Sequence, residues 1–455
     1  MKDVVIVGGG LAGLSAAWRL RHWDTVLLEA DLRVGGRIRS ERRGQYWMNW
    51  GGHVFAGPGT ATDSLLVGAG VTAVDIPGSL QGLHLNGKFI PKGAPWSYPF
   101  RVPMSMRSRL ATIATGAKVV AGVARYTNVV RSRPGESAEV RQKRIYDFDN
   151  DRTFAELIGT PPRDTASLFE VTVTRSAGNM DELAAGSGIG YFSHVHGIGQ
   201  GLKRGVVGGP STLTEAVAAT LGDRIELGAR VHEVVHRPGS VVVRYTQDGR
   251  ELEVEARTAV LATTADVSHR IGVDLPEDLR DALGQIKYGP QVSSAFLTNE
   301  TTRRPWDDNY AIATPKRSFA IVLNQANIVR GSEAERQPGG SIMVFSPAAL
   351  GARLLDKTDQ EIQAIHLRDL EEVLGPGFGD TVIEAGTSRW QVGTPYCFPG
   401  RARLQTTLLR GADRVYLAGD YTGTLYSETA IASGFTAAQR AVSVLATERQ
   451  TRFGR

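Results

Sequence analysis

The chain has 455 residues, of which 42% are hydrophobic and 22% are charged, and this balance is that of a globular protein rather than a disordered one. The formal net charge of +5 is too small for this length to indicate nucleic-acid binding, so we expect no nucleic-acid partner. The one cysteine, Cys397, excludes an internal disulfide and suits a reducing compartment.

Length and hydropathy also limit the architecture. A chain of this size predicts two domains. No apolar run approaches the roughly 20 residues that a membrane-spanning helix needs. The first predicted strand starts at residue 3, which leaves no room for a signal peptide, and we therefore expect a cytoplasmic protein.

The first thirty residues have the pattern of a strand, a helix and a second strand. Residues 3–7 form an apolar run typical of a buried parallel strand, and 11–21 form a helix rich in alanine and leucine. Residues 25–29 form a second apolar strand that ends in an acid, Glu29. This order predicts a βαβ unit of the kind that binds nucleotides.

Glycines in the first turn of this unit indicate a dinucleotide site. Gly8 permits a tight turn, Gly10 lets the backbone approach a pyrophosphate, and Gly13 lets the helix pack closely on the strand. The helix that follows presents free N–H groups to phosphate. Glu29, at the end of the second strand, can bind the ribose hydroxyls and disfavours a 2′-phosphate.

The middle of the chain changes character twice. Residues 101–146 contain ten Lys or Arg and two acids, with apolar residues at helical spacing. Two interpretations stay open for this segment: a solvated helical face, or a basic amphipathic surface that rests on anionic lipid or faces an acidic partner. Residues 206–260 return to short strands around a helix, and 276–395 alternate strands with a helix, as in a second, sheet-based domain.

The C-terminal region repeats the strand–loop–helix pattern of the first turn. Residues 415–420 (VYLAGD) form a strand and loop, and 427–434 (SETAIASG) open a helix. Glycine pairs also follow the first unit, at Gly35-Gly36-Arg37 and at Gly51-Gly52-His53. Two such ends in one chain favour a flavoprotein.

In this order, these motifs resemble those of the superfamily of FAD-dependent amine oxidases, protoporphyrinogen oxidases and phytoene desaturases. The resemblance also includes Trp390, Pro395 and Pro399-Gly400, and a middle segment from Gly209 through Val231 to Ala262-Thr263. It implies noncovalent FAD and an α/β fold: a Rossmann-like, glutathione-reductase-like FAD domain interleaved with an α+β substrate domain that has a mixed sheet. The expected FAD domain comprises 1–90, 206–275 and 396–455, and the expected substrate domain, with a helical insert, comprises 91–205 and 276–395.

The resemblance carries cofactor roles to matching positions of this chain. It places residues of the first turn on the pyrophosphate, Glu29 on the ribose, and Val231 at the adenine. It places the Gly51–Gly52 pair near the isoalloxazine ring. The full set of expected cofactor contacts is Gly8, Gly10, Leu11, Ala12, Gly13, Glu29, Ala30, Gly36, Arg37, Gly51, Gly52, Val231, Ala262, Gly419, Asp420, Thr429, Ala430 and Ile431.

The chemistry that the superfamily performs is hydride transfer from a small molecule to flavin, and the sequence favours dehydrogenation of a C–C bond. Amine oxidases commonly carry a lysine in a substrate-domain strand, whereas 291–296 has none and Lys287 precedes that strand. The run Gly51 to Phe55 resembles the Gly-x-His-Val-Phe stretch of carotenoid-type desaturases. Oxidation of a C–N bond by a flavin amine oxidase is the alternative, and a non-redox flavin isomerase or mutase is a further one.

Candidate catalytic and substrate residues follow the same motifs. His53 is a candidate proton acceptor or a structural histidine, and Tyr426 is a candidate aromatic wall beside the flavin. Tyr396 and Phe398 are expected to supply the opposite wall, where paired aromatic rings bind a cation or orient a neutral amine. His194 and His196 lack further ligands, so we expect no metal site.

Overall fold

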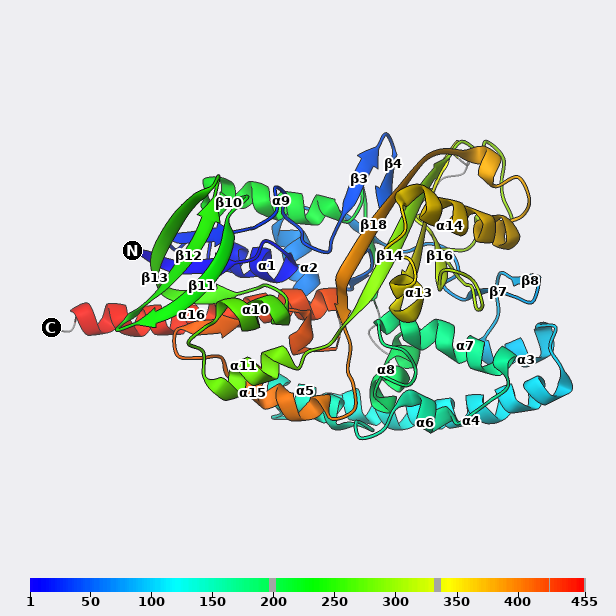
Figure 1. Cartoon of the computed structure of the whole chain (residues 1–455), viewed down its shortest axis with the longest axis horizontal. Coiled ribbons are helices and arrows are strands. Elements are labelled where there is room, and N and C mark those ends of the chain that lie inside the picture. Colours follow the sequence, from blue (N-terminus) through cyan, green and yellow to red (C-terminus); the bar gives the residue numbers. More distant parts are fainter. Residues whose placement is uncertain (196–201, 331–336, 425, 454–455) are drawn as a thin grey trace.

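The computed structural model describes residues 1–195, 202–330, 337–424 and 426–453, with side chains except those of 202 and 449–453. Two sheets stand side by side in Figure 1, and a group of helices lies beneath the second one. The N-terminal strand and the C-terminal helix belong to the same half of the molecule. The fold is therefore a mixed α/β architecture with two sheets.

The first sheet has the strand order β10-β2-β1-β13-β12-β11, and β19 pairs with β13. Its parallel part contains β10, β2, β1, β13 and β19, and its antiparallel part contains β11, β12 and β13. The strands are β1 (Lys2–Val7), β2 (Thr25–Leu28), β10 (Ile225–Glu226), β11 (Arg230–Arg237), β12 (Ser240–Gln247), β13 (Arg250–Leu261) and β19 (Val415–Leu417).

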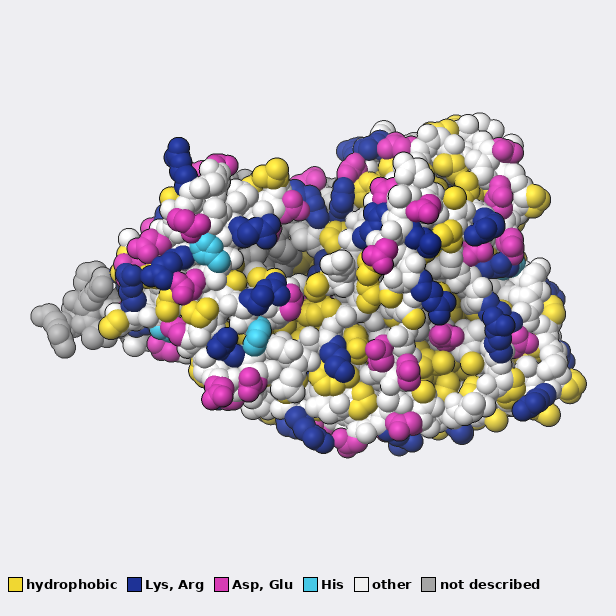
Figure 2. Space-filling model, in the orientation of Figure 1, with side chains coloured by type: hydrophobic (Ala, Val, Ile, Leu, Met, Phe, Trp, Pro, Cys, Tyr) yellow, Lys and Arg dark blue, Asp and Glu magenta, His cyan; other side chains and the backbone are white. Residues whose placement is uncertain are grey.

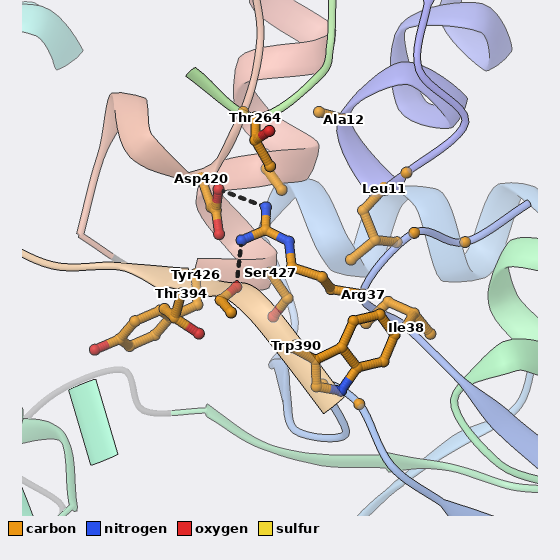
Figure 3. Close-up of a pocket in the computed structure, with 18 of the residues that line it drawn as sticks. Leu11, Ala12, Arg37, Ile38, Thr264, Trp390, Thr394, Asp420, Tyr426 and Ser427 are labelled. Carbon is orange, nitrogen blue, oxygen red and sulfur yellow. Dashed lines mark hydrogen bonds and ion pairs between the residues drawn. The ribbon is translucent and has the colours of Figure 1, made fainter. Parts of the chain in front are cut away.

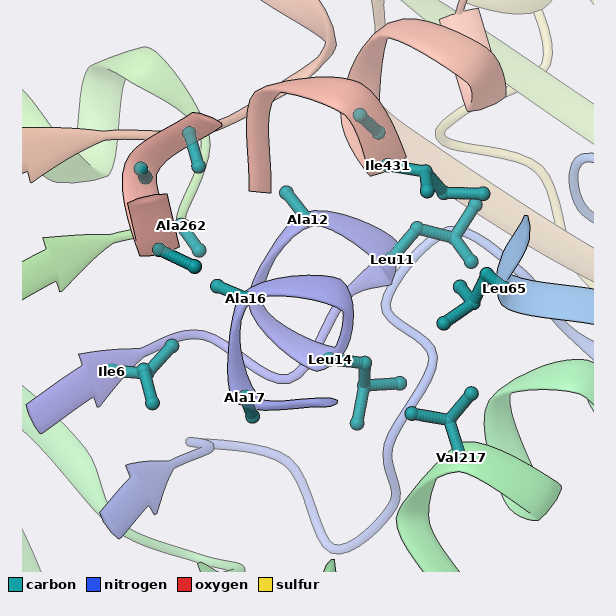
Figure 4. Packing of buried hydrophobic residues seen from close by; sticks show 14 of the residues in the cluster. Ile6, Leu11, Ala12, Leu14, Ala16, Ala17, Leu65, Val217, Ala262 and Ile431 are labelled. Atoms are coloured by element: carbon teal, nitrogen blue, oxygen red, sulfur yellow. The ribbon is translucent and has the colours of Figure 1, made fainter. Parts of the chain in front are cut away.

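Strand β1 is apolar without alternation because both faces of the sheet are covered. Val4 and Ile6 pack against one set of helices, and Val5 and Val7 pack on the opposite side. Figure 4 shows the first of these cores around α1. The helices on that side are α1 (Leu11–Arg19), α2 (Ala61–Gly68), α9 (Ser211–Leu221) and α16 (Tyr426–Phe453), and those on the other are α10 (Ala265–Ile271), α11 (Glu277–Gly284) and α15 (Gln405–Arg410).

The second sheet is mixed and has the order β18-β14-β17-β16-β15-β7-β8. Only the β15–β7 pair is parallel among its described pairs. The strands are β7 (Gly82–Leu85), β8 (Lys88–Ile90), β14 (Tyr288–Thr298), β15 (Ala311–Ala313), β16 (Ile321–Asn324), β17 (Gly340–Pro347) and β18 (Val382–Pro395). Strands β7 and β8 lie in this sheet, whereas the sequence analysis assigned 82–90 to the FAD domain. Short strands so close to the boundary carry no periodicity that shows which sheet they join.

Short strands outside the two large sheets form two small ones: β3 (Ser40–Arg43) with β4 (Tyr46–Asn49), and β5 (Phe55–Ala56) with β9 (Leu202–Val206) and β6 (Ala73–Asp75). Between strands of the second sheet lie α12 (Asn327–Arg330), α13 (Ala348–Ala352) and α14 (Asp359–Leu374). The helices beneath the second sheet are α3 (Tyr98–Arg101), α4 (Met106–Val130), α5 (Ala138–Asp147), α6 (Phe154–Ile158), α7 (Arg163–Val173) and α8 (Ala185–Val195). They surround a core of their own that includes Phe154, Phe169 and Ile189.

Charged side chains of both signs are interspersed over the face shown in Figure 2. Among the described residues, no helix combines the length and the apolar character needed to cross a membrane.

Candidate active site

A cavity of about 660 Å³ is lined by residues of both sheets and of the helical group. At one end it meets the first turn of the βαβ unit and Glu29. At the other it meets Arg175, Tyr191 and Tyr310. The two halves of the chain therefore share a single continuous site.

The Gly-rich turn leaves one side open to the cavity and packs tightly on the other. A Cβ on Gly10 would meet no heavy atom within 4 Å, and Gly10, Leu11 and Ala12 line the cavity. A Cβ on Gly13 would stand 1.8 Å from the carbonyl oxygen of Gly8, so only glycine allows this approach of α1 to the turn. The free N–H groups at the start of α1 can therefore meet a phosphate without an obstructing side chain, and Gly13 contributes through packing.

Glu29 lies beside this turn at the end of β2. Its Oε2 accepts the N–H of Gly9 at 2.5 Å, and its Oε1 accepts the N–H of Asp31 at 2.7 Å. Both bonds fix the carboxylate at the cavity wall, next to Ala30 and Val231. Open space at Gly10, a helix N-terminus and a fixed carboxylate fit the phosphate and ribose of a dinucleotide.

Arg37 crosses the middle of the cavity and joins its two C-terminal segments. Its Nη1 donates to the carbonyl of Gly393 at 2.6 Å, and its Nη2 donates to Oδ1 of Asp420 at 2.9 Å (Figure 3). Trp390, whose indole N–H donates to the carbonyl of Trp50 at 3.2 Å, lies on the same wall. Residues more than 350 positions apart are thereby held around one space.

The first turn of α16 borders this part of the cavity. Tyr426, Ser427 and Ala430 line it, whereas Thr429 does not. The side chain of Ile431 is fully buried in the core near Leu11 (Figure 4). Any contact of Ile431 with a cofactor would therefore be through its backbone.

The structure defines the charge and tautomer of His53. Its Nδ1 lies 3.1 Å from the carbonyl oxygen of Gly51. A carbonyl only accepts, so Nδ1 carries the proton. Burial lowers the pKa of His53 to about 4, and the hydrogen bond to Gly51, which raises the pKa, offsets only part of this effect. At neutral pH the ring is uncharged, and Nε2 is left as a hydrogen-bond acceptor.

Tyrosines form the closed end of the cavity. The ring of Tyr426 stands edge-on to that of Tyr191, with centroids 6.3 Å apart. Tyr310 lies 6.4 Å from the His53 ring. Tyr426 has φ +45°, a left-handed conformation that costs a bulky residue roughly 1–2 kcal/mol. Such strain is typical of positions that a functional site holds in place.

The predicted second wall does not match the structure. Neither Tyr396 nor Phe398 lines the cavity, and both pack on the core of the helical group. The chain turns away from the site after Pro395, and the N–H of Tyr396 bonds the carbonyl of Lys287 at 3.1 Å. The aromatic ring that accompanies Tyr426 in the cavity is instead Tyr191, from α8, which packs edge-on against it.

The remaining sequence-based expectations are placed as follows. Cys397 lines a separate small cavity of about 30 Å³, which also touches Tyr426. His194 lines both cavities, and His196 lies outside the described residues. The part of the chain that the structure describes holds no cluster of three or more candidate metal ligands. The predicted cofactor residues on the main cavity are Gly8, Gly10, Leu11, Ala12, Glu29, Ala30, Gly36, Arg37, Gly51, Gly52, Val231, Ala262, Gly419, Asp420 and Ala430.

Several lining residues were not identified from the sequence as part of the site, among them Arg175, Tyr191, Tyr310 and Gln291. Gln291 begins the strand segment in which a lysine was sought. Arg175 and Tyr191 come from the helical insert, where no local motif marks them.

Comparisons with known proteins agree with this geometry. The sequence profile described as flavin containing amine oxidoreductase matches residues 11–442. The L-amino-acid oxidase of Sistrurus catenatus edwardsii is 25% identical, covering 96% of this chain and 86% of its own. That of Cerastes cerastes is 24% identical over the same shares.

Solved structures show the same fold. A double mutant of putrescine oxidase superposes with a TM-score of 0.76 at 18% identity, covering 97% of this chain and 99% of its own. Cyclohexylamine oxidase from Brevibacterium oxydans IH-35A gives a TM-score of 0.75 at 18% identity, covering 98% and 99%.

Proposed function

Since the chain belongs to the flavin-containing amine oxidoreductase family and is an FAD-dependent oxidase, we propose that it oxidises the C–N bond of a small amine with noncovalently bound FAD. The sequence alone favoured C–C dehydrogenation, and the comparisons support its alternative instead. The names of the relatives and structural neighbours, amino acid and amine oxidases, support nitrogen-bearing substrates.

The polar lining of the closed end carries this proposal. His53 presents a free Nε2, and Gln291 and the tyrosines add further polar atoms. An apolar polyene would bury these groups without partners, which costs free energy for each of them. The same cavity must also hold the dinucleotide, and this favours a small substrate.

The residues of the chain have distinct roles in this proposal. FAD, when bound, accepts the hydride that leaves the carbon next to nitrogen. His53, with its pKa near 4, is too weak a base to deprotonate an ammonium group, so we assign Nε2 to accept a hydrogen bond from a neutral amine. Tyr191 and Tyr426, whose rings pack edge-on against each other, form one wall that orients the substrate and excludes water.

Anaerobic mixing of the purified yellow protein with panels of amines, amino acids and polyenes tests the reaction type. We expect nitrogen compounds to bleach the flavin, and air to restore the colour while hydrogen peroxide and a carbonyl product appear. Bleaching by polyenes alone would overturn the proposal. Gly10→Glu is the control: its side chain enters open space next to α1, so the variant should fold without FAD.

A further inference from the structure

Arg175 carries an uncompensated charge at the closed end of the cavity. It lies in the short turn that follows α7, and its Nε donates to the carbonyl of Val171 at 3.1 Å. Among the described residues, no carboxylate lies within ion-pair distance, and neither Nη atom has a hydrogen-bond partner. The guanidinium carbon lies 5.8 Å from the ring centre of Tyr191.

Two other arginines of the cavity are paired with an acid. Arg37 bonds Asp420 at 2.9 Å, and Arg33 lies 3.5 Å from Asp31. The ionisable groups that act on Arg175 are tyrosines. Burial lowers its pKa, and the smaller effects of Tyr191, Tyr98 and Tyr426 raise it. A cation removed from water without a counter-ion is unfavourable. Its free Nη donors point to an anionic ligand in the neighbouring space.

We propose that Arg175 binds an acidic group of the substrate, so that the substrate is an amine that also bears a carboxylate. This inference rests on the proposed C–N oxidation. A guanidinium group binds a carboxylate through two parallel hydrogen bonds. The ring of Tyr191 limits the orientation of the Arg175 guanidinium plane. Arg175 is a substrate-binding residue that sets specificity and leaves FAD binding unchanged.

A pair of inert probes tests the anion site without turnover. Phenylacetate and 2-phenylacetamide share a shape and differ in charge. We expect phenylacetate alone to raise the melting temperature of the holoenzyme and to perturb its flavin spectrum. Arg175→Met should weaken phenylacetate binding by about 10- to 100-fold, the loss of a charge-assisted bond, with Arg175→Lys in between. Equal binding of both probes by wild type, or an unchanged affinity in Arg175→Met, would overturn the inference.

Turnover separates this inference from the proposed function. An amino acid and its decarboxylated amine are compared in wild type, Arg175→Met and the exposed control Arg303→Met. We expect Arg175→Met to raise KM for the amino acid alone, and Arg303→Met to match wild type. Equal effects on both substrates would reject the role of Arg175 while C–N oxidation stands. If no nitrogen compound bleaches the flavin although phenylacetate binding depends on Arg175, the proposed function fails and the anion site stands.

A separate feature, on the outer surface, is an exposed apolar stripe along α4 and the segment before it. Its members recur on one side of the helix, while the other side packs on α7 and α8. Monomeric soluble proteins rarely expose so continuous a stripe. Its large apolar side chains, between 43% and 78% exposed, are Trp96, Phe100, Met106, Leu110, Ile113 and Val120.

The charge of this segment is of one sign. Residues 96–131 contain six Lys or Arg and no acid. In contrast, two cations of α5 pair with nearby acids: Arg144 bonds Glu136, just before the helix, at 2.6 Å, and Lys143 bonds Asp147 at 2.6 Å. The basic amphipathic surface is therefore 96–131, narrower than the predicted 101–146. Figure 2 shows basic and apolar side chains mixed along the lower edge, where α4 lies.

We infer that the 96–131 surface rests on an anionic lipid bilayer. Exposed Trp and Phe beside aliphatic residues, flanked by Arg and Lys, enter the boundary between headgroups and acyl chains. The flanking cations strengthen this contact through attraction to anionic lipid. An acidic protein partner would suit the same charge, and the test below distinguishes it from a bilayer.

Cosedimentation with vesicles of phosphatidylcholine, with or without phosphatidylglycerol, tests this surface. We expect binding only to anionic vesicles, reduced at least several-fold by Leu110→Ser with Val120→Ser, and also by Arg107→Glu with Lys118→Glu. Ile383→Ser and Arg303→Glu are controls at exposed positions elsewhere and should bind like wild type. Binding that survives both pairs of substitutions, or protein that self-associates through this stripe and ignores vesicles, would overturn the inference.

Discussion

Glu428 joins the first turn of α16 to the N-terminus of α2. Its Oε1 accepts the N–H of Ala61 at 2.9 Å, and its Oε2 accepts the N–H and hydroxyl of Thr62 at 2.9 and 2.6 Å. These N–H groups belong to the first turn of α2, where no acceptor within the helix is available. Because α16 begins at Tyr426, the same carboxylate also steadies a wall of the cavity. We predict that its removal affects both stability and catalysis.

The geometry sets the size of the stability effect. Bonds to a charged acceptor contribute about 1.5–3 kcal/mol each, and water replaces part of this at a half-buried site. We therefore expect Glu428→Ala to lower the free energy of unfolding by about 2–4 kcal/mol. In Glu428→Gln the amide oxygen accepts one N–H while its NH₂ group faces another donor. This variant should lose about 1–2 kcal/mol.

Urea unfolding of the holoenzyme measures these losses, and stopped-flow reduction of the flavin measures the effect on Tyr426. We expect flavin reduction to be fastest in wild type, slower in Glu428→Gln and slowest in Glu428→Ala. Gln439→Ala is the control on the same helix: the side chain of Gln439 is exposed, and a substitution at such a position usually changes the free energy of unfolding by at most about 0.5 kcal/mol. If the free energies of unfolding of Glu428→Ala and Glu428→Gln both lay within about 0.5 kcal/mol of wild type, the capping role of Glu428 would be refuted.

Three further predictions concern the packing and charges of the same fold. Gly13→Ala should abolish the yellow colour and cost about 3 kcal/mol or more, since its Cβ would overlap the Gly8 carbonyl; an intact flavin spectrum would contradict this. Burial lowers the pKa of His366 to about 4, whereas in the unfolded chain the same ring takes up a proton near pH 6.5. The free energy of unfolding should therefore be highest above pH 6.5 and fall by about 3 kcal/mol as the pH drops to 4. His366→Leu should flatten the unfolding profile over this range. In a double-mutant cycle, Arg37→Met and Asp420→Asn should show a coupling of about 1–3 kcal/mol in unfolding; additive losses would mean that their bond contributes nothing.

The βαβ unit could be predicted because its signals are local. The apolar run before Gly8, the helical spacing after Gly10 and the acid at Glu29 lie within thirty residues, and each has a backbone reason. The start of α16 was predicted on similar grounds. These elements line the cavity in the structure, so motif order was enough to bring the two ends of the chain together.

The substrate end of the cavity could not be predicted because its residues carry no local pattern. Arg175 and Tyr191 belong to helices whose periodicity reports only which face is buried. Tyr396 and Phe398 were chosen because they lie close to a flavin motif in sequence, but β18 ends at Pro395 and the chain then turns into the helical core. Proximity along the chain gives no direction for a side chain after such a turn.

Arg175 and the neutral His53 together restrict the charge of the substrate. Two unit charges about 6 Å apart repel by roughly 3 kcal/mol at an effective dielectric constant of about 20, so a simple amine would have to enter this end uncharged. An amine that carries a carboxylate reverses the sign of that interaction, because its negative group neutralises the guanidinium. The nitrogen can then lose its proton to solvent before the substrate is buried, and its lone pair is free for oxidation. The cavity therefore favours an acidic amine over a monoamine of the same size by the charge on Arg175 alone.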